Sequence, residues 1–168
     1  MALTSKITPY NADWPNQYRV EVSKLAPVFG SALVDIHHVG STAIPGLAAK
    51  PEIDVLAVVE NITHVEDWTD ALTLQGYRRG GDLSDGHLFF KRDVDGVRTH
   101  KLHLCISGHP KIGEMLGFRD FLRLNREVRD EYQALKLRLE RDNTAGIAQY
   151  LKGKEPFIRS ILKQTGLV

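Results

Sequence analysis

The sequence has few of the features that mark several large classes of protein. Its 168 residues include one cysteine, Cys105, so no disulfide can form within the chain. That composition is typical of the reducing cytoplasm and excludes a disulfide-stabilised fold. No apolar run approaches the roughly 18 residues that span a membrane, and residues 1–10 lack the apolar stretch of a secretory signal. We therefore expect a soluble, cytoplasmic protein with no membrane partner.

The chain also lacks an excess of charge of either sign. It has 22 basic and 21 acidic residues, for a formal net charge of +1, so there is no strong signal for nucleic acid. Four arginines share a helical spacing, but acidic residues stand between them, which favours a salt-bridged solvent face. These are Arg119, Arg123, Arg126 and Arg129. No internal repeat is present, and the length predicts a single domain over 1–168.

Hydrophobic periodicity predicts a mixed arrangement of strands and helices. Runs rich in β-branched and apolar residues indicate strands. They cover 33–39, 53–59, 77–79, 87–92 and 97–106. Apolar residues at helical spacing predict a helix ending before Gly30, a crossover helix ending at Gly76, one long helix across 118–139 and a last helix over about 145–164. The predicted fold class is α/β (α+β): a mixed β-sheet with flanking helices and a helical C-terminal segment.

The loop after the first strand is the most informative segment. Gly40, Ser41 and Thr42 form a turn in which backbone N–H groups could approach a phosphate closely. Glu52 and Asp54 follow at the start of the next strand, and their spacing places both side chains on one face, where they could hold Mg²⁺ or Mn²⁺. Lys50 could supply positive charge nearby.

A simpler interpretation of this loop stays open. Gly40-Ser41-Thr42 could be only a helix cap, and Asp54 could only pair with Lys50. Asp54, however, interrupts an apolar run that suits a strand covered on both faces. An unpaired buried carboxylate costs several kcal/mol, so Asp54 should have a partner or a function.

Seven segments, spread over nearly the whole chain, resemble the GrpB family of small bacterial proteins. They are Pro9–Pro15, His38–Pro51, Ile53–Val55, Arg98–His103, Phe118–Leu122, Tyr132–Lys136 and Tyr150–Lys154. The resemblance implies the nucleotidyltransferase-like fold, in which a Gly-Ser turn precedes a strand with Asp-x-Asp or Asp-x-Glu, and a third carboxylate lies on a later strand. It also implies a link to dephospho-CoA kinase, to which related domains are fused.

The sequence departs from that transferase pattern in two places. Asp54 is followed by Val55 and Leu56, so a second carboxylate is present only if Glu52 serves. The later strand, 98–105, has no Asp or Glu but offers His100 and His103. These departures put a two-Mg²⁺ mechanism in doubt, because Mg²⁺ prefers hard oxygen ligands.

The histidines and basic residues near the motif supply further candidate groups. Strand alternation should place His100 and His103 on opposite faces, so one of them, with Asp54 and His38, could bind Zn²⁺ or Mn²⁺, or act as a general base. Otherwise they are ordinary strand histidines. Lys91 and Arg98, on neighbouring strands of a predicted hairpin, could meet a triphosphate, or they form a solvated edge.

Two functional hypotheses follow. In the first, a divalent metal on Asp54 and Glu52 binds a nucleoside triphosphate whose phosphates lie on the turn. An acceptor hydroxyl or amine then attacks the α-phosphorus, and pyrophosphate leaves. In the second, the metal site has degenerated. The pocket then binds a nucleotide, a CoA-like ligand or a partner protein without chemistry.

Overall fold

A five-stranded mixed sheet forms the centre of the computed structural model, which describes residue 3 and residues 5–168. The strands are β1 (Leu33–Val39), β2 (Ile53–Val59), β3 (Tyr77–Arg79), β4 (His87–Val94) and β5 (Val97–Ile106). Their order is β1-β2-β5-β4-β3. β2 and β5 run parallel, and every other neighbouring pair is antiparallel. The parallel pair places β2 in the interior of the sheet, which explains its apolar composition.

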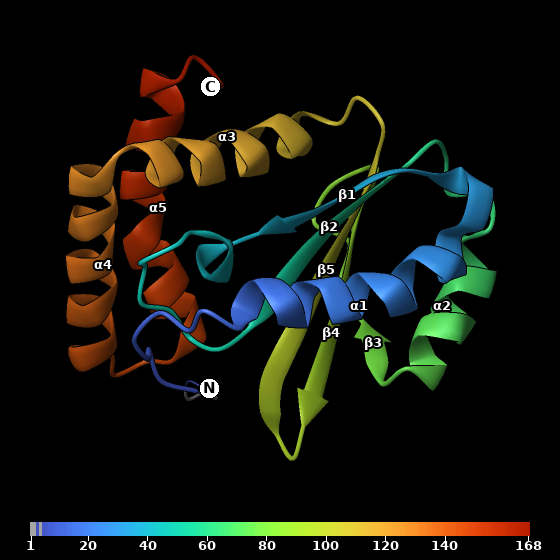
Figure 1. The fold of residues 1–168 in the computed structure, drawn as a ribbon, viewed down its shortest axis with the longest axis horizontal. Coiled ribbons are helices and arrows are strands. Elements are labelled where there is room, and N and C mark those ends of the chain that lie inside the picture. Colours follow the sequence, from blue (N-terminus) through green and yellow to red (C-terminus); the bar gives the residue numbers. More distant parts are fainter. Residues whose placement is uncertain (1–2, 4) are drawn as a thin grey trace.

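Helices cover both faces of this sheet (Figure 1). α1 (Trp14–Phe29) and α2 (Val65–Leu74) pack on one face, where the largest core cluster includes Trp14, Leu72 and alternate residues of β2 and β5. The opposite face carries α3 (Pro110–Leu124), whose apolar side chains meet Val39, Leu56, Val58 and Cys105. Alternation along each strand therefore separates two sets of side chains, and Asp54 belongs to the α3 face.

The C-terminal third forms a helical layer beside the sheet. α4 (Arg126–Arg141) and α5 (Ile147–Gln164) lie against α3 at one end of the molecule (Figure 1). Their own core contains Ile44 and Leu47 of the loop after β1, together with Leu122, Tyr132 and Ile161. The loop that follows the Gly-Ser turn is thus fixed by the C-terminal helices, through burial of apolar surface.

The predicted fold class is confirmed. Four predicted strands have the observed bounds, and the fourth along the chain extends to Val94, because a two-residue turn at Asp95–Gly96 closes the hairpin. The single long helix predicted across 118–139 is wrong, because the extended backbone of Asn125, with φ −124° and ψ 91°, separates α3 from α4. Within the described residues, no helix is long and apolar enough to cross a membrane.

Candidate functional site

The turn after β1 lies directly against Asp54. Val39, the last residue of β1, pairs in register with Asp54 of β2. Gly40 has φ 75° and ψ −177°, a conformation that essentially only glycine adopts. A Cβ atom at Gly40 would lie 2.1 Å from Asp54 Oδ2, so a larger residue could not occupy the position without moving the carboxylate. The glycine therefore allows the turn and the carboxylate to touch.

Three arginines of the C-terminal helices fix the same turn from outside. Arg119 Nη1 donates to His38 O at 3.0 Å, Arg123 Nε to Ala43 O at 2.9 Å, and Arg129 Nη1 to Pro45 O at 3.0 Å. The acidic residues between these arginines favoured a salt-bridged solvent face. Arg119 does pair with Asp120, but the same guanidinium also binds the main chain before the turn. The arginines consequently position the site.

An ammonium group lies between the two candidate metal-binding carboxylates. Lys101 of β5 is the register partner of Asp54. Its Nζ is 3.2 Å from Glu52 Oε2 and 3.5 Å from Asp54 Oδ1. The Asp54 and Lys101 side chains are 15% and 27% exposed, so the group reaches solvent. Lys91 of β4 pairs with Lys101 in turn, which extends a row of charged residues across this face.

Helices α4 and α5 add two more lysines and two tyrosines. Lys136 Nζ, on a side chain that is almost fully buried, donates to Ser41 Oγ at 3.0 Å and to Ala48 O at 2.7 Å. Lys154 Nζ lies over the Tyr150 ring at 4.6 Å, and Lys50 Nζ lies over the same ring at 4.8 Å. Lys136 Nζ lies over the ring of Tyr132 at 5.1 Å. We call Lys50, Lys101, Lys136 and Lys154 the lysine cluster.

The lysine cluster holds more positive charge than its two carboxylates balance. Burial, reinforced by neighbouring lysines, lowers the pKa of Lys136 and of Lys154 to about 7. Burial also lowers the pKa of Lys50, against the opposing effect of Glu52. Burial opposes the charged form of Lys101 as well, but Asp54 and Glu52 outweigh it and raise its pKa. Burial raises the pKa of Asp54, although Lys101 opposes the shift. Lys101 therefore stays charged. An anion bound beside Lys50, Lys136 and Lys154 would stabilise their charged forms.

His38 holds the turn onto β2 rather than facing the lysine cluster. Its Nε2 lies 2.9 Å from Thr42 Oγ1, which in turn donates to the carbonyl oxygen of Glu52 at 3.0 Å. Its ring stacks on Tyr18, with centroids 4.7 Å apart. Burial and the nearby Arg123 lower the pKa of His38 to about 4, so the ring is neutral at pH 7. His38 and Thr42 together form a neutral connection between the turn and Glu52.

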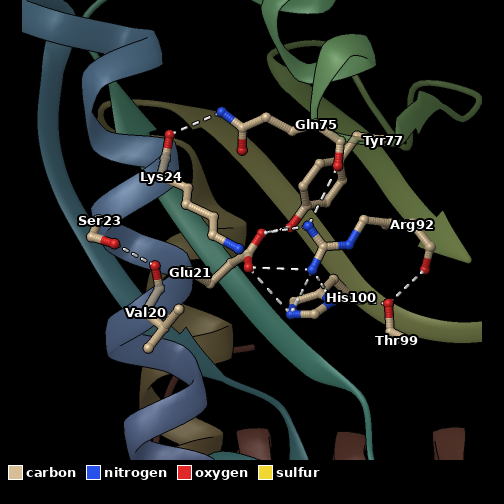
Figure 2. A network of polar contacts seen from close by, with 9 residues as sticks. All are labelled: Val20, Glu21, Ser23, Lys24, Gln75, Tyr77, Arg92, Thr99 and His100. Carbon is tan, nitrogen blue, oxygen red and sulfur yellow. Dashed lines mark hydrogen bonds and ion pairs between the residues drawn. The ribbon is translucent and has the colours of Figure 1, made fainter. Parts of the chain in front are cut away.

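His100 precedes Lys101, the register partner of Asp54, so it lies on the opposite face of the sheet from Asp54. Figure 2 shows it beside Glu21 and Arg92. Its Nε2 is 3.4 Å from Glu21 Oε2, and Arg92 donates to its Nδ1 at 2.8 Å. Glu21 is only 2% exposed. Its carboxylate also accepts from Tyr77 Oη at 2.7 Å and from Arg92 Nη1 and Nη2 at 3.2 and 3.3 Å. Burial lowers the pKa of His100 to about 4 despite Glu21. The structure therefore places His100 in a packing network and away from the turn.

His103 shares the face of Asp54 but lies further along β5, opposite Leu56. Its Nδ1 is 2.9 Å from His87 Nε2, and its ring contacts Phe89. Burial lowers the pKa of His103 to about 3. Arg98, at the far end of the hairpin, makes an ion pair with Asp93. Of the predicted basic residues, Lys50 thus lies in the lysine cluster, Lys91 is beside it, and Arg98 is engaged elsewhere.

A groove of about 340 Å³ lies beside the turn, with His38 before it and Ala43 and Pro45 after it among the residues of its wall. Its wall includes Tyr10, Tyr18 and His38, and three arginines line it: Arg19, Arg119 and Arg123. The groove therefore combines aromatic surface with positive charge.

The donor set does not fit a resident divalent metal. Glu52 and Asp54 supply two carboxylates, but the Lys101 ammonium lies against both. A metal there would meet repulsion from a charged lysine at contact distance. No group of three or more His, Cys, Asp or Glu side chains in the described part of the chain is placed to hold a metal ion.

Comparison with known proteins agrees with this arrangement of turn, sheet and helices. The model of the family described as "GrpB protein" matches residues 4–164. The chain belongs to the GrpB family. It is 36% identical over 156 residues to the UPF0157 protein YqkA of Bacillus subtilis, which covers 92% of this chain and 45% of YqkA. The crystal structure of GrpB from Enterococcus faecalis matches with a TM-score of 0.88 and 30% identity, over 95% of this chain and 96% of that one.

Two further comparisons extend beyond the GrpB family. The poly(U) polymerase Cid1, in a structure bound to MgATP, matches with a TM-score of 0.58 at 10% identity, over 88% of this chain and 50% of that one. This confirms the nucleotidyltransferase-like fold. A dephospho-CoA kinase of Mycolicibacterium paratuberculosis is 27% identical over 184 residues, which cover 95% of this chain and 45% of the kinase. Part of a protein that carries the kinase's name is thus similar to this chain.

Sequence reasoning missed five residues of the site. Lys101 was overlooked beside the two histidines of its strand, and Lys136, Lys154, Tyr132 and Tyr150 lie about 80 to 110 residues from the turn. A signal was available, because residues 132–136 and 150–154 each place a tyrosine and a lysine four residues apart, on one helix face. That spacing predicts a shared surface but not what the surface packs against.

Proposed function

We propose that this GrpB-family chain binds a phosphate-bearing nucleotide, either a nucleoside triphosphate or a CoA-like ligand, at the lysine cluster and the Gly-Ser turn. The observation that carries the proposal is the lysine cluster around two carboxylates. Lys50 and Lys101 pair with Glu52 and Asp54, Lys136 contacts Ser41 of the turn, and Lys154 shares the Tyr150 ring with Lys50. Four ammonium groups against two carboxylates leave up to two positive charges unbalanced. A phosphate group matches that surplus.

The turn and the tyrosines suit the remaining parts of such a ligand. Ser41 adds a hydroxyl beside Lys136, and Tyr150 already receives two ammonium groups over its ring. The shared fold with nucleotide-binding Cid1 supports a nucleotide as the ligand class, though at 10% identity it supports only that.

The direct test is ligand binding by the purified chain and by two matched variants. ATP, GTP, CTP, UTP and CoA are titrated while the melting temperature is followed, since a ligand that binds only the native state raises it. Lys154→Met should lower the affinity about tenfold or more, because a charge-assisted contact contributes about 1.5–3 kcal/mol. Lys152→Met, an exposed lysine of the same helix, is the control and should leave the affinity unchanged. Equal effects of the two variants would contradict the proposal.

A second candidate is transfer of a nucleoside monophosphate to an acceptor. The arginine-lined groove beside the turn favours it, because a second, anionic substrate could lie there. The acceptor oxygen or nitrogen would attack the α-phosphorus, and pyrophosphate would leave. Pyrophosphate formed by the wild type and absent with Asp54→Asn would support transfer over binding alone.

A further inference from the structure

The two carboxylates at the turn need a cation, and the fold supplies one of its own. Glu52, directly before β2, is 7% exposed, and Asp54 follows two residues later within β2. Like charges that are close together and partly buried repel strongly unless a positive charge lies between them. Lys101 Nζ contacts an oxygen of each, and Lys50 Nζ is 4.0 Å from the other oxygen of Glu52.

We propose that the Lys101 ammonium is the resident cation of this site, and that phosphate binding therefore needs no divalent metal. The inference rests on the proposed function and deepens it. Lys101 is fixed by its register against Asp54, so the ammonium belongs to the sheet and not to a mobile loop. A divalent ion would have to displace an ammonium that has two ion pairs, in a region that already holds Lys50, Lys136 and Lys154.

This assignment inverts the expected role of Asp54. In a metal site the carboxylate attracts the cation that carries the phosphates, so removing it abolishes nucleotide binding. In a lysine site the carboxylate competes with the phosphates for the same ammonium groups. Asp54→Asn should therefore keep the affinity for a phosphate ligand, or increase it severalfold, with Lys101 still present to contact the anion.

The first experiment uses the wild type. ATP is titrated in EDTA and again with excess Mg²⁺, and Mn²⁺ alone is titrated by electron paramagnetic resonance. We expect ATP to bind in EDTA and Mn²⁺ alone to remain free. ATP binding only with Mg²⁺ would overturn the inference and leave the proposed function standing. Stoichiometric Mn²⁺ binding that Asp54→Asn removes would overturn it too, even if no nucleotide bound. Failure of every phosphate ligand, with or without metal, would contradict the proposed function itself.

The second experiment converts the site. Lys101→Asp places three carboxylates together and should create Mn²⁺ binding, with ATP binding now dependent on Mn²⁺. Lys91→Asp is the matched control, because it makes the same change of charge on the same face but on β4, one strand further from the carboxylates than Lys101. Mn²⁺ binding by Lys91→Asp equal to that of a folded Lys101→Asp would contradict the assignment. If Lys101→Asp does not fold, the wild-type titrations decide alone.

Discussion

The contact between Gly40 and Asp54 makes a quantitative prediction about stability. An alanine at position 40 would have to keep φ 75° and ψ −177°, in a region that costs of order 1–3 kcal/mol for residues other than glycine. Its Cβ would also lie 2.1 Å from Asp54 Oδ2 and 2.8 Å from Asp54 Cγ, so the carboxylate must rotate away from Lys101. Breaking one partly buried ion pair adds about 1–3 kcal/mol. Gly40→Ala should therefore reduce the free energy of unfolding by about 2–6 kcal/mol.

Gly30→Ala is the matched control for this substitution. Gly30 has φ 55° and ψ −132°, and a Cβ there would meet no atom within 4 Å, so the variant changes the backbone strain alone. Urea unfolding of Gly40→Ala, Gly30→Ala, Asp54→Ala and the double variant Gly40→Ala/Asp54→Ala measures the coupling. We expect Gly40→Ala to cost about 1–3 kcal/mol less once the Asp54 carboxylate is absent. Equal losses in Gly40→Ala and Gly30→Ala, with no coupling to Asp54, would refute the account of the turn.

Three further predictions follow from the charges. ATP binding should weaken as the pH rises from 6 to 8, because Lys136 and Lys154 have pKa values of about 7 and lose their protons. An ATP affinity that stays the same across this pH range in isothermal titration calorimetry would contradict this. His103, with a pKa of about 3 against 6.5 in the unfolded chain, should make the protein less stable as the pH falls from about 6.5 to 3, since only the unfolded state takes up the proton. His103→Phe should reduce that dependence in urea unfolding without removing it, because His38 and His100, with pKa values of about 4, contribute in the same direction. Glu21→Gln should destabilise the fold by about 3–5 kcal/mol, because it leaves Arg92 without its buried carboxylate, and a loss under 1 kcal/mol in thermal unfolding would count against that role.

The fold was largely predictable because its strands follow simple local rules. Runs of apolar and β-branched residues determined β1, β2 and β5, and the predicted bounds agree with those observed. The separation of α3 from α4 was not predictable, since Asn125 stands within a continuous helical pattern. In the structure the Asn125 side chain donates to Phe121 O at 2.8 Å, at the end of α3.

The site was predictable only where its parts are close in the sequence. The turn and Asp54 are separated by a short loop, so their proximity follows from an antiparallel pairing of two strands. Predicting Lys101 would have required the knowledge that β5 lies parallel to β2 and in which register. Strand alternation alone does not tell which residue of β5 lies beside Asp54. The lysines of α4 and α5 required the position of a whole helical layer, which no local spacing specifies.

The arginine contacts with the turn give the site an unequal tolerance to sequence change. Arg119, Arg123 and Arg129 donate to main-chain oxygens, and every amino acid carries such an oxygen. Residues on the receiving side can therefore be exchanged without removing an acceptor, whereas each arginine is irreplaceable for its own bond. Of the groove-lining residues, Ala43 and Pro45 can therefore vary while the arginines still hold the backbone in place, whereas Gly40, Ser41 and Thr42 also act through their own conformation or side chains.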